Sequence, residues 1–157
     1  MGNKYHITVE TTIDSDINTI WDKMINTREY GDWNSFIKKI TIEKQILLEG
    51  TKMKFEVQFK NGKKTTSDEQ VKLFKPPHNN QGTIEAEWIY DFTGFLHNIG
   101  MVRASRTQKL TQLENGSVHY YTCEKFSGWG KIFLPLKNVK AGFDTHAADL
   151  KKHCEKL

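Results

Sequence analysis

The sequence predicts an α+β protein in which a curved antiparallel sheet is closed by one long C-terminal helix. Two helix-like segments bracket a long middle region that is rich in strand patterns. The first segment carries Ile17, Ile20, Trp21, Met24 and Ile25, and the second carries Leu136, Val139, Phe143, Ala147, Leu150, Cys154 and Leu157. Spacings of three and four place these apolar side chains on one face of each helix. Because a curved sheet closed by one helix tends to enclose a space, we expect an internal cavity and a binding function.

The composition predicts one compact domain covering residues 1–157. The chain has 157 residues, of which 37% are hydrophobic and 27% are charged. This is long enough to bury a core and too apolar for a disordered chain. The formal net charge is +4, and the lysines are spread along the chain rather than grouped with aromatic residues. We therefore expect solvated basic surfaces and no nucleic-acid partner.

Location is predicted from what the sequence lacks. Cys123 and Cys154 are the only cysteines, which is too few for the disulfide framework of a small secreted protein. The first residues have no apolar signal-peptide core, and no apolar run is long enough to span a bilayer. We expect a cytoplasmic protein, monomeric or homodimeric, with no stable membrane insertion.

The N-terminal region predicts a strand followed by two helices. Apolar and polar residues alternate over residues 5–13, as in a half-buried strand. Asp14 or Ser15 offers a side-chain oxygen to the free amides at the start of the first helix. A short second helix is expected over residues 28–32, and the isoleucines of residues 40–42 indicate the next strand.

A hairpin is predicted around Asn61-Gly62. The strand before it alternates apolar and polar residues, with Met53, Phe55, Val57 and Phe59 on one face. Asn-Gly tolerates the positive φ angles of a two-residue type I′ turn. Such a turn would place Asp68 opposite Phe55 and Gln70 opposite Met53, so that an apolar face would meet a polar one.

Two alternatives explain this mismatch. A bulge could shift the register and turn Val71 and Leu73 inwards. Alternatively, Thr66, Asp68 and Gln70 line a polar patch inside the cavity. In that case a buried Asp68 would need a partner or a raised pKa, and either would make it the polar anchor for a ligand.

The rest of the middle region predicts further strands and turns. Residues 76–82, with two prolines, three amides and a glycine, predict a loop, and residues 84–90 alternate as a strand. The pattern breaks over residues 92–100. Asn115-Gly116 then predicts a second hairpin. Gly142 lies inside the last helix, where glycine costs about 1 kcal/mol relative to alanine, so we expect backbone or ligand to approach closely there.

Several common sites are missing. The sequence has no GxxxxGK[ST] phosphate loop, no GxGxxG, no GxSxG and no CxxC. His146, Asp149 and His153 share one helical face, but such residues are ordinary on the polar side of a helix, so we expect no metal site and no cofactor. The candidates for a general acid or base are the strand carboxylates Asp68, Glu85 and Glu87. The simpler interpretation is that all three are ordinary exposed positions on strands.

Aromatic residues are more numerous than a small core needs, with four Trp, five Tyr and nine Phe. Apolar walls with a few polar groups are typical of small-molecule pockets. The candidate ligand-binding residues are Trp33, Phe55, Asp68, Phe74, Trp88, Tyr90, Phe92, Phe95, Met101, Phe126 and Phe143. The alternative is that each of these rings simply fills the core.

Three stretches of the sequence resemble one family. They are Ile17-x-x-Ile20-Trp21 with Tyr30-x-x-Trp33-Asn34-x-Phe36, then Glu49-Gly50-Thr51-x-Met53, and finally Asn115-Gly116-Ser117 leading to Glu124-x-Phe126-x-Gly128, Gly142-Phe143 and Leu150-Lys151. In this order they are similar to the START-like (SRPBCC) superfamily, close to its polyketide cyclase/dehydratase-like branch. Ser35 stands where the family usually has proline.

The resemblance implies a helix-grip fold, in which a curved antiparallel sheet wraps round a long C-terminal helix and leaves a hydrophobic cavity. Members of the superfamily include lipid and sterol carriers, hormone receptors, polyketide cyclases and chaperone-ATPase activators, so the fold limits the function without fixing it.

Three functions are therefore predicted, in descending order of support. The first is a cofactor-free carrier or sensor that binds a small hydrophobic or aromatic molecule. The second is a cyclase or dehydratase acting on a polyketide-like substrate, and the third is a chaperone-activator-like interaction module. A buried acid with a raised pKa in the cavity would favour the enzyme. A dry, empty cavity would favour the carrier, and a filled core with a large exposed apolar patch would favour the module.

Overall fold

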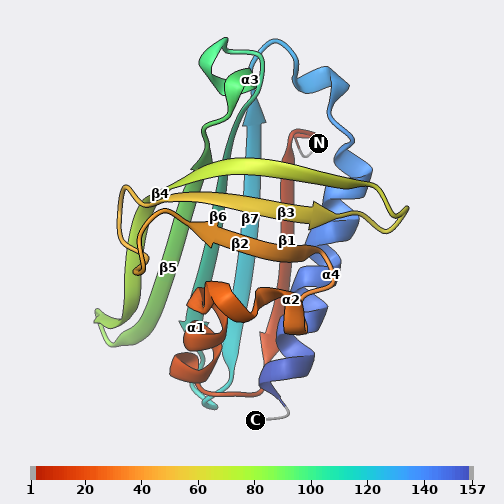
Figure 1. Cartoon of the computed structure of the whole chain (residues 1–157). Coiled ribbons are helices and arrows are strands. Elements are labelled where there is room, and N and C mark those ends of the chain that lie inside the picture. Colours follow the sequence, from red (N-terminus) through yellow and green to blue (C-terminus); the bar gives the residue numbers. More distant parts are fainter. Residues whose placement is uncertain (1–2, 156–157) are drawn as a thin grey trace.

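The computed structural model describes residues 3–155, which form one curved antiparallel sheet and a small set of helices (Figure 1). The sheet has seven strands, in the spatial order β1-β7-β6-β5-β4-β3-β2. Their bounds are β1 His6–Ile13, β2 Ile37–Ile42, β3 Lys52–Gln58, β4 Lys64–Asn80, β5 Thr83–Phe92, β6 Arg103–Gln112 and β7 Val118–Ser127. Every neighbouring pair is antiparallel.

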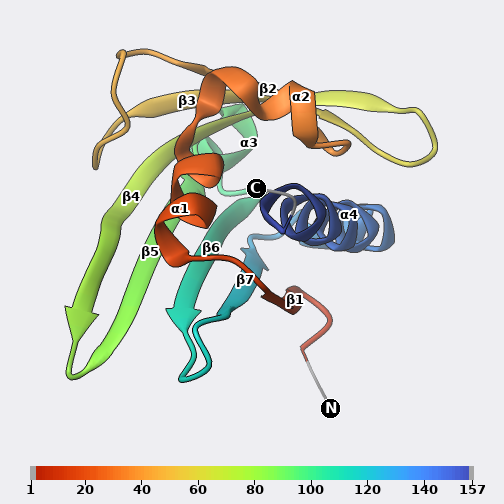
Figure 2. The same ribbon diagram turned by 90° about the horizontal axis from the view of Figure 1, so that it is seen from below.

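The helices lie between β1 and β2, at one end of the sheet, and along its inner face. They are α1 Ile17–Ile25, a 3-10 turn Thr27–Glu29, α2 Tyr30–Trp33, α3 Phe95–Asn98, a second 3-10 turn Lys131–Phe133, and α4 Leu136–Cys154. Viewed along α4, the sheet curves round this helix, with β1 on one side of it and β2 on the other (Figure 2). The predicted helix-grip fold and the predicted order of elements are confirmed.

The two main helices follow from their sequence patterns. Asp16 caps the N-terminus of α1, and its carboxylate accepts hydrogen bonds from the amides of Asn18 and Thr19, both at 3.0 Å. The prediction of Asp14 or Ser15 as the cap is therefore wrong by one or two positions. The apolar stripe of α4 is buried at Phe143, Ala147, Leu150 and Cys154, as expected, and Leu157 lies outside the described residues.

Both Asn-Gly hairpins use three-residue loops rather than two-residue turns. The amide of Phe59 donates to the carbonyl of Lys63 at 2.9 Å, so Lys60, Asn61 and Gly62 form the first loop. The amide of Leu113 likewise donates to Ser117 at 2.8 Å, across a loop that ends at Gly116. In each loop only the glycine has a positive φ, whereas a type I′ turn needs two such residues.

This loop geometry changes the register of β3 and β4 by one residue. Phe55 is paired with Ser67, and Met53 is paired with Glu69. The predicted pairing of Phe55 with Asp68 is wrong. Because side chains alternate between the faces of a sheet, the shift moves Asp68 to the outer face and Glu69 to the inner face.

β4 is longer than the sequence predicts and is irregular at two points. Its register with β5 shifts between Val71 and Leu73 and again between Lys75 and His78. The first irregularity supports the bulge alternative for Val71, which is buried and paired with Tyr90. The expected inward position of Leu73 is wrong, because Leu73 is paired with Ile89 on the outer face and Phe74 packs against the core instead. Pro76 and Pro77 occupy the second irregularity, where a missing amide donor breaks no ladder bond. The expected loop over residues 76–82 is thus mostly strand, and the turn itself is Gln81-Gly82.

The core lies between the inner face of the sheet and the helices α1, α2 and α4. Trp88, Tyr120 and Leu110 are among its fully buried side chains. None of the helices in residues 3–155 is both long enough and apolar enough to cross a membrane.

Candidate functional site

The inner face of the sheet and the N-terminal half of α4 line a cavity of about 430 Å³ that is partly open to solvent. Its walls are mainly apolar, and they include Phe36, Ile37, Phe55, Val57, Phe59, Phe92, Leu96, Val102, Ala104, Phe126, Leu134, Pro135, Val139 and Phe143. Four residues with large polar side chains line it from the inner face of the sheet, namely Glu69, Tyr90, Arg106 and Glu124. Residues 63–67 of the β3–β4 hairpin, which are all polar and mostly exposed, line it as well. The cavity is therefore a mainly apolar space with a polar cluster on the sheet and a second, more exposed polar stretch.

Strand register brings the four polar residues together. Tyr90 on β5 is paired with Arg106 on β6, and Arg106 is paired in turn with Glu124 on β7. Glu69 on β4 is paired with Phe92, which is two residues along β5 from Tyr90 and on the same face. Directly paired residues have Cβ atoms about 5 Å apart. Four adjacent strands thus each place one polar side chain in the same region of the inner face.

Arg106 is the cation of this cluster. Its side chain is buried, and its guanidinium group lies over the ring of Phe143, 4.0 Å from the ring centroid. Nε donates to Thr122 Oγ1 at 3.1 Å, and Nη1 donates to the Tyr90 hydroxyl at 3.2 Å. Nη2 is buried and has no hydrogen-bond partner among the described residues, where Arg106 also has no ion pair within 4.0 Å. One donor group of a buried cation is thus left without an acceptor.

The guanidinium group is held in place by a hydrogen-bonded network behind it. The Tyr90 hydroxyl accepts a second hydrogen bond from Gln108 Nε2 at 3.1 Å. Gln108 Oε1 in turn accepts one from the Tyr120 hydroxyl at 2.8 Å. Because all these residues are buried, the network fixes Tyr90 and through it the direction of the Arg106 donors.

Glu69 and Glu124 are the two acids of the cluster. Glu69 is only 7% exposed, and its Oε1 accepts a hydrogen bond from Ser67 Oγ at 2.5 Å. Burial, and secondarily the charge of Glu124, raises the pKa of Glu69 to about 8. Burial also raises the pKa of Glu124 to about 7, although the charge of Arg106 opposes the shift. Near neutral pH the cluster therefore contains a permanent cation and at least one protonated carboxyl group.

His146 lies next to this network but not on the polar face that the sequence predicts for it. It is fully buried, stacked on Tyr120 and edge-on to Trp33. Burial, together with the charge of Arg106, holds the pKa of His146 well below its usual value, so the ring is neutral. Asp149 instead accepts a hydrogen bond from the amide of Ser35 at 2.7 Å. Within residues 3–155, no group of three or more His, Cys, Asp or Glu side chains is arranged to hold a metal ion.

The structure divides the predicted ligand-binding residues into two groups. Those that line the cavity are Phe55, Tyr90, Phe92, Phe126 and Phe143. The others lie elsewhere: Trp33 and Trp88 are buried in the core, Phe74 packs on Trp21 with ring centroids 5.2 Å apart, Met101 packs against Gly130, and Phe95 is exposed. A role in binding stays a prediction for the first group.

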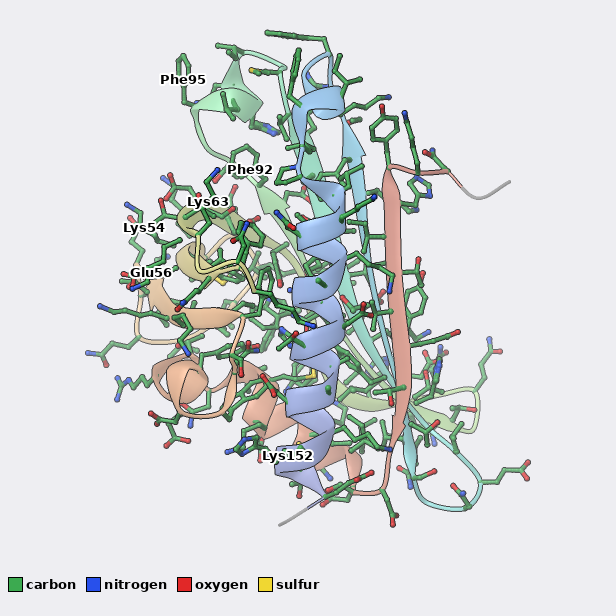
Figure 3. The ribbon with its side chains drawn as sticks, turned by 90° about the vertical axis from the view of Figure 1, so that its right-hand side faces the viewer. Lys54, Glu56, Lys63, Phe92, Phe95 and Lys152 are labelled. Carbon is green, nitrogen blue, oxygen red and sulfur yellow. The ribbon has the colours of Figure 1, made fainter. Side chains whose placement is uncertain are left out.

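The predicted position of Asp68 inside the cavity is wrong. Its side chain is 57% exposed, and it lies 3.8 Å from Nζ of Lys54 on the outer face of the sheet. Figure 3 shows Lys54 and Glu56 pointing away from α4. The residue that enters the cavity is its neighbour Glu69, for which the three-residue loop is the physical reason.

Sequence reasoning missed Glu69, Arg106 and Glu124. A signal for the last two was present, because Arg106 is in strand phase with the apolar Ala104 and Leu110, and Glu124 is in phase with Phe126. A charged residue in phase with an apolar face is the sequence pattern of a buried polar site.

Comparisons with known proteins support the fold. No protein-family model and no curated protein matches the sequence. A hypothetical protein of Helicobacter pylori has a similar solved structure, with a TM-score of 0.71 and 16% identity over 97% of this chain and 89% of that one. A START superfamily protein of Mycobacterium smegmatis aligns with a TM-score of 0.67 and 14% identity over 97% and 98% of the two chains.

A third similar structure is the di-domain ARO/CYC BexL from the BE-7585A biosynthetic pathway. It aligns with a TM-score of 0.65 and 10% identity over 98% of this chain and 52% of that one. The TM-scores establish a shared fold, whereas sequence identities this low leave the function open. The chain has the helix-grip fold of START-like proteins, as its sequence predicts.

Proposed function

We propose that the protein binds a small, mainly apolar molecule that carries an oxygen-bearing polar end. In this proposal residues 1–157 act as one cofactor-free ligand-binding domain of the carrier or sensor type. The observation that supports it most directly is the buried Arg106 Nη2, which has no acceptor among the described residues and belongs to a side chain that lines the cavity.

The energetics of Arg106 explain why a ligand oxygen suits this place. A buried donor without a partner costs about 1–3 kcal/mol, and more when the group is charged. A carboxylate, sulfonate or carbonyl oxygen on the ligand would accept from Nη2, while the protonated Glu69 could donate to the same end. Phe55, Phe92, Phe126 and Phe143 would surround the apolar remainder.

A matched pair of fluorescent probes tests the proposal. One is 8-anilinonaphthalene-1-sulfonate, and the other is its uncharged parent, N-phenyl-1-naphthylamine. We expect the native protein to bind both. Arg106→Gln should lower the affinity for the sulfonate probe by about tenfold or more, because it removes one charge-assisted hydrogen bond. It should change the affinity for the uncharged parent by less than about twofold.

Arg103→Gln is the matched control, because Arg103 lies on the same strand but is exposed. It should leave both affinities unchanged. Retained binding of the uncharged parent shows that the Arg106→Gln protein keeps its cavity. Equal loss of both probes in a folded Arg106→Lys protein, or no binding of either probe to the native protein, would contradict the proposal.

A dehydratase or cyclase is the second candidate, and the two acids of the cluster favour it. Glu69 and Glu124 have pKa values raised to about 8 and about 7, the range in which a carboxyl group can give or take a proton at neutral pH. Elimination of water from a β-hydroxy ketone would need one group to take the α-proton and one to protonate the departing hydroxyl. Measurable elimination that Glu69→Gln and Glu124→Gln each abolish would support an enzymatic function. The absence of elimination would support the ligand-binding function alone.

Location and partners belong to the same proposal. We propose that the protein acts in the cytoplasm, since Cys123 and Cys154 are both free thiols buried in the fold. Its partner is the small ligand, and we propose no nucleic-acid partner, because the lysines are spread along the chain. The interaction-module alternative is less well supported, because the cavity is not filled by side chains.

A further inference from the structure

Six large apolar side chains are exposed together at one end of the molecule. They come from two segments, residues 93–103 around α3 and residues 128–137, which lead into the start of α4; together we call them the tip. The exposed side chains are Phe95 (73% exposed), Leu96 (37%), Ile99 (47%), Trp129 (64%), Ile132 (65%) and Phe133 (72%). Figure 1 shows both segments at the same end of the sheet, and Figure 3 shows Phe95 pointing outwards from it.

Hydrogen bonds join the two segments into one surface. The amide of Gly130 donates to the carbonyl of Met101 at 2.8 Å, and the Trp129 indole donates to the carbonyl of Ile99 at 3.5 Å. Leu96 and Leu134, one from each segment, line the cavity. The tip therefore borders the cavity at this end of the fold.

The tip is basic and contains no acid. Residues 93–103 and 128–137 include Arg103, Lys131 and Lys137 but no Asp or Glu. Arg103 and Lys137 are exposed, and Lys131 Nζ lies 4.6 Å from the centroid of the Tyr5 ring. An apolar surface with cations and without carboxylates is attracted to an anionic surface.

We propose that the tip docks on the surface of an anionic lipid bilayer. Phe95, Trp129 and Phe133 would enter the interfacial region, where large amphipathic and aromatic side chains are most stable, and the cations would face lipid head groups. A second copy of the chain fits less well, because a symmetric contact would bring the acid-free tips together and oppose like charges. The proposal does not depend on what the cavity binds.

Tryptophan fluorescence can report docking at this surface. Trp129 is 64% exposed, whereas Trp21, Trp33 and Trp88 are buried. Vesicles of phosphatidylcholine with 30% phosphatidylserine, roughly the anionic content that gives a cytoplasmic surface potential, should shift the emission of Trp129 to the blue. The protein should also sediment with these vesicles. With pure phosphatidylcholine vesicles both effects should be at least about fivefold weaker, and added salt should weaken binding to the anionic vesicles.

Substitutions at exposed positions distinguish the contribution of the tip to vesicle binding from that of the rest of the surface. Phe133→Glu should weaken vesicle binding by about tenfold or more, because it removes a ring that docking would bury in the bilayer and adds a charge that the anionic lipids repel. Ile46→Glu is the matched control, since Ile46 is 66% exposed but lies on the loop between β2 and β3. It should bind as the native protein does. Trp129→Phe should abolish the spectral shift and keep sedimentation.

Three results would overturn the proposal. The first is the absence of sedimentation with anionic vesicles at low salt. The second is equal weakening by Phe133→Glu and Ile46→Glu. The third is a native dimer, seen by light scattering, that Phe133→Glu converts to a monomer, because that result would assign the tip to a second copy of the chain.

Discussion

At the scale of single residues, the buried Glu69 should make the stability of the protein depend on pH. Its carboxyl group is buried in the cavity wall, and burial raises its pKa from 4.5 to about 8. In the unfolded chain the same group ionises near its ordinary value. Between these two pH values the folded state holds a proton that the unfolded state has lost, so stability falls as the pH rises.

Glu69→Gln should remove this dependence. Relative to the native protein, the free energy of unfolding of the variant should rise by about 1.4 kcal/mol per pH unit between about 4.5 and about 8, and then level off. Glu124→Gln is the matched comparison, and its free energy of unfolding relative to the native protein should level off near pH 7. Urea unfolding at a series of pH values measures both. Parallel pH curves for the native protein and Glu69→Gln would mean that the carboxyl group is solvated.

At the scale of elements, α4 depends on a glycine where helix propensity disfavours one. A Cβ atom at Gly142 would lie 2.3 Å from the Phe36 ring, so the helix backbone packs directly on that ring. The close approach predicted at Gly142 is present, but the side chain of Phe36 makes it rather than the backbone or ligand that the sequence predicts. Phe36 lines the cavity and lies edge-on to Phe143, with ring centroids 6.0 Å apart. The glycine therefore fixes the distance between α4 and one cavity wall.

Gly142→Ala should destabilise the protein, against the propensity scale. Propensity alone would add about 1 kcal/mol, whereas forcing the Phe36 ring aside should cost about 1–3 kcal/mol. Ala148→Gly, at an exposed position of the same helix, measures the effect of helix propensity alone and should lower the free energy of unfolding by about 1 kcal/mol. Thermal unfolding of the two variants compares them. A stabilised Gly142→Ala protein would show that the ring moves freely.

At the scale of the whole molecule, the cavity joins parts of the chain that are far apart in sequence. Phe55, Tyr90, Arg106 and Phe126 reach it from four strands, and Phe143 reaches it from α4. A ligand held there contacts elements that unfolding would separate. Binding should therefore stabilise the fold as a unit, by about 2.7 kcal/mol when the free ligand is at a hundred times its Kd.

Val139→Phe should reproduce this stabilisation without a ligand. Val139 lines the cavity from α4, and the larger side chain of phenylalanine would fill part of the apolar space. The variant should unfold at a higher temperature than the native protein and gain nothing further from N-phenyl-1-naphthylamine. Lys152→Phe adds the same ring at the exposed far end of α4, visible in Figure 3, and should still respond to the probe. An unchanged response of Val139→Phe to the probe would place binding outside the cavity.

The sequence by itself determined the order and type of the main elements, apart from α3 and the second half of β4. Apolar periods of two and of three to four residues decide which segments become strands and which become helices, because each must bury one face. Tyr90, Phe126 and Phe143 follow from these periods as inward-facing residues, and α4 follows from its stripe. The resemblance to START-like proteins then supplied the arrangement of these elements in space.

Only the tertiary structure decided which polar groups meet. A hairpin loop one residue longer than expected exchanged Asp68 for Glu69, since neighbouring strand residues face opposite sides of the sheet. Arg106 and Glu124 are 18 positions apart in sequence but are paired across β6 and β7. Register, curvature and burial arise from pairings between distant segments, and these set the pKa values and the unpaired donor of the cavity.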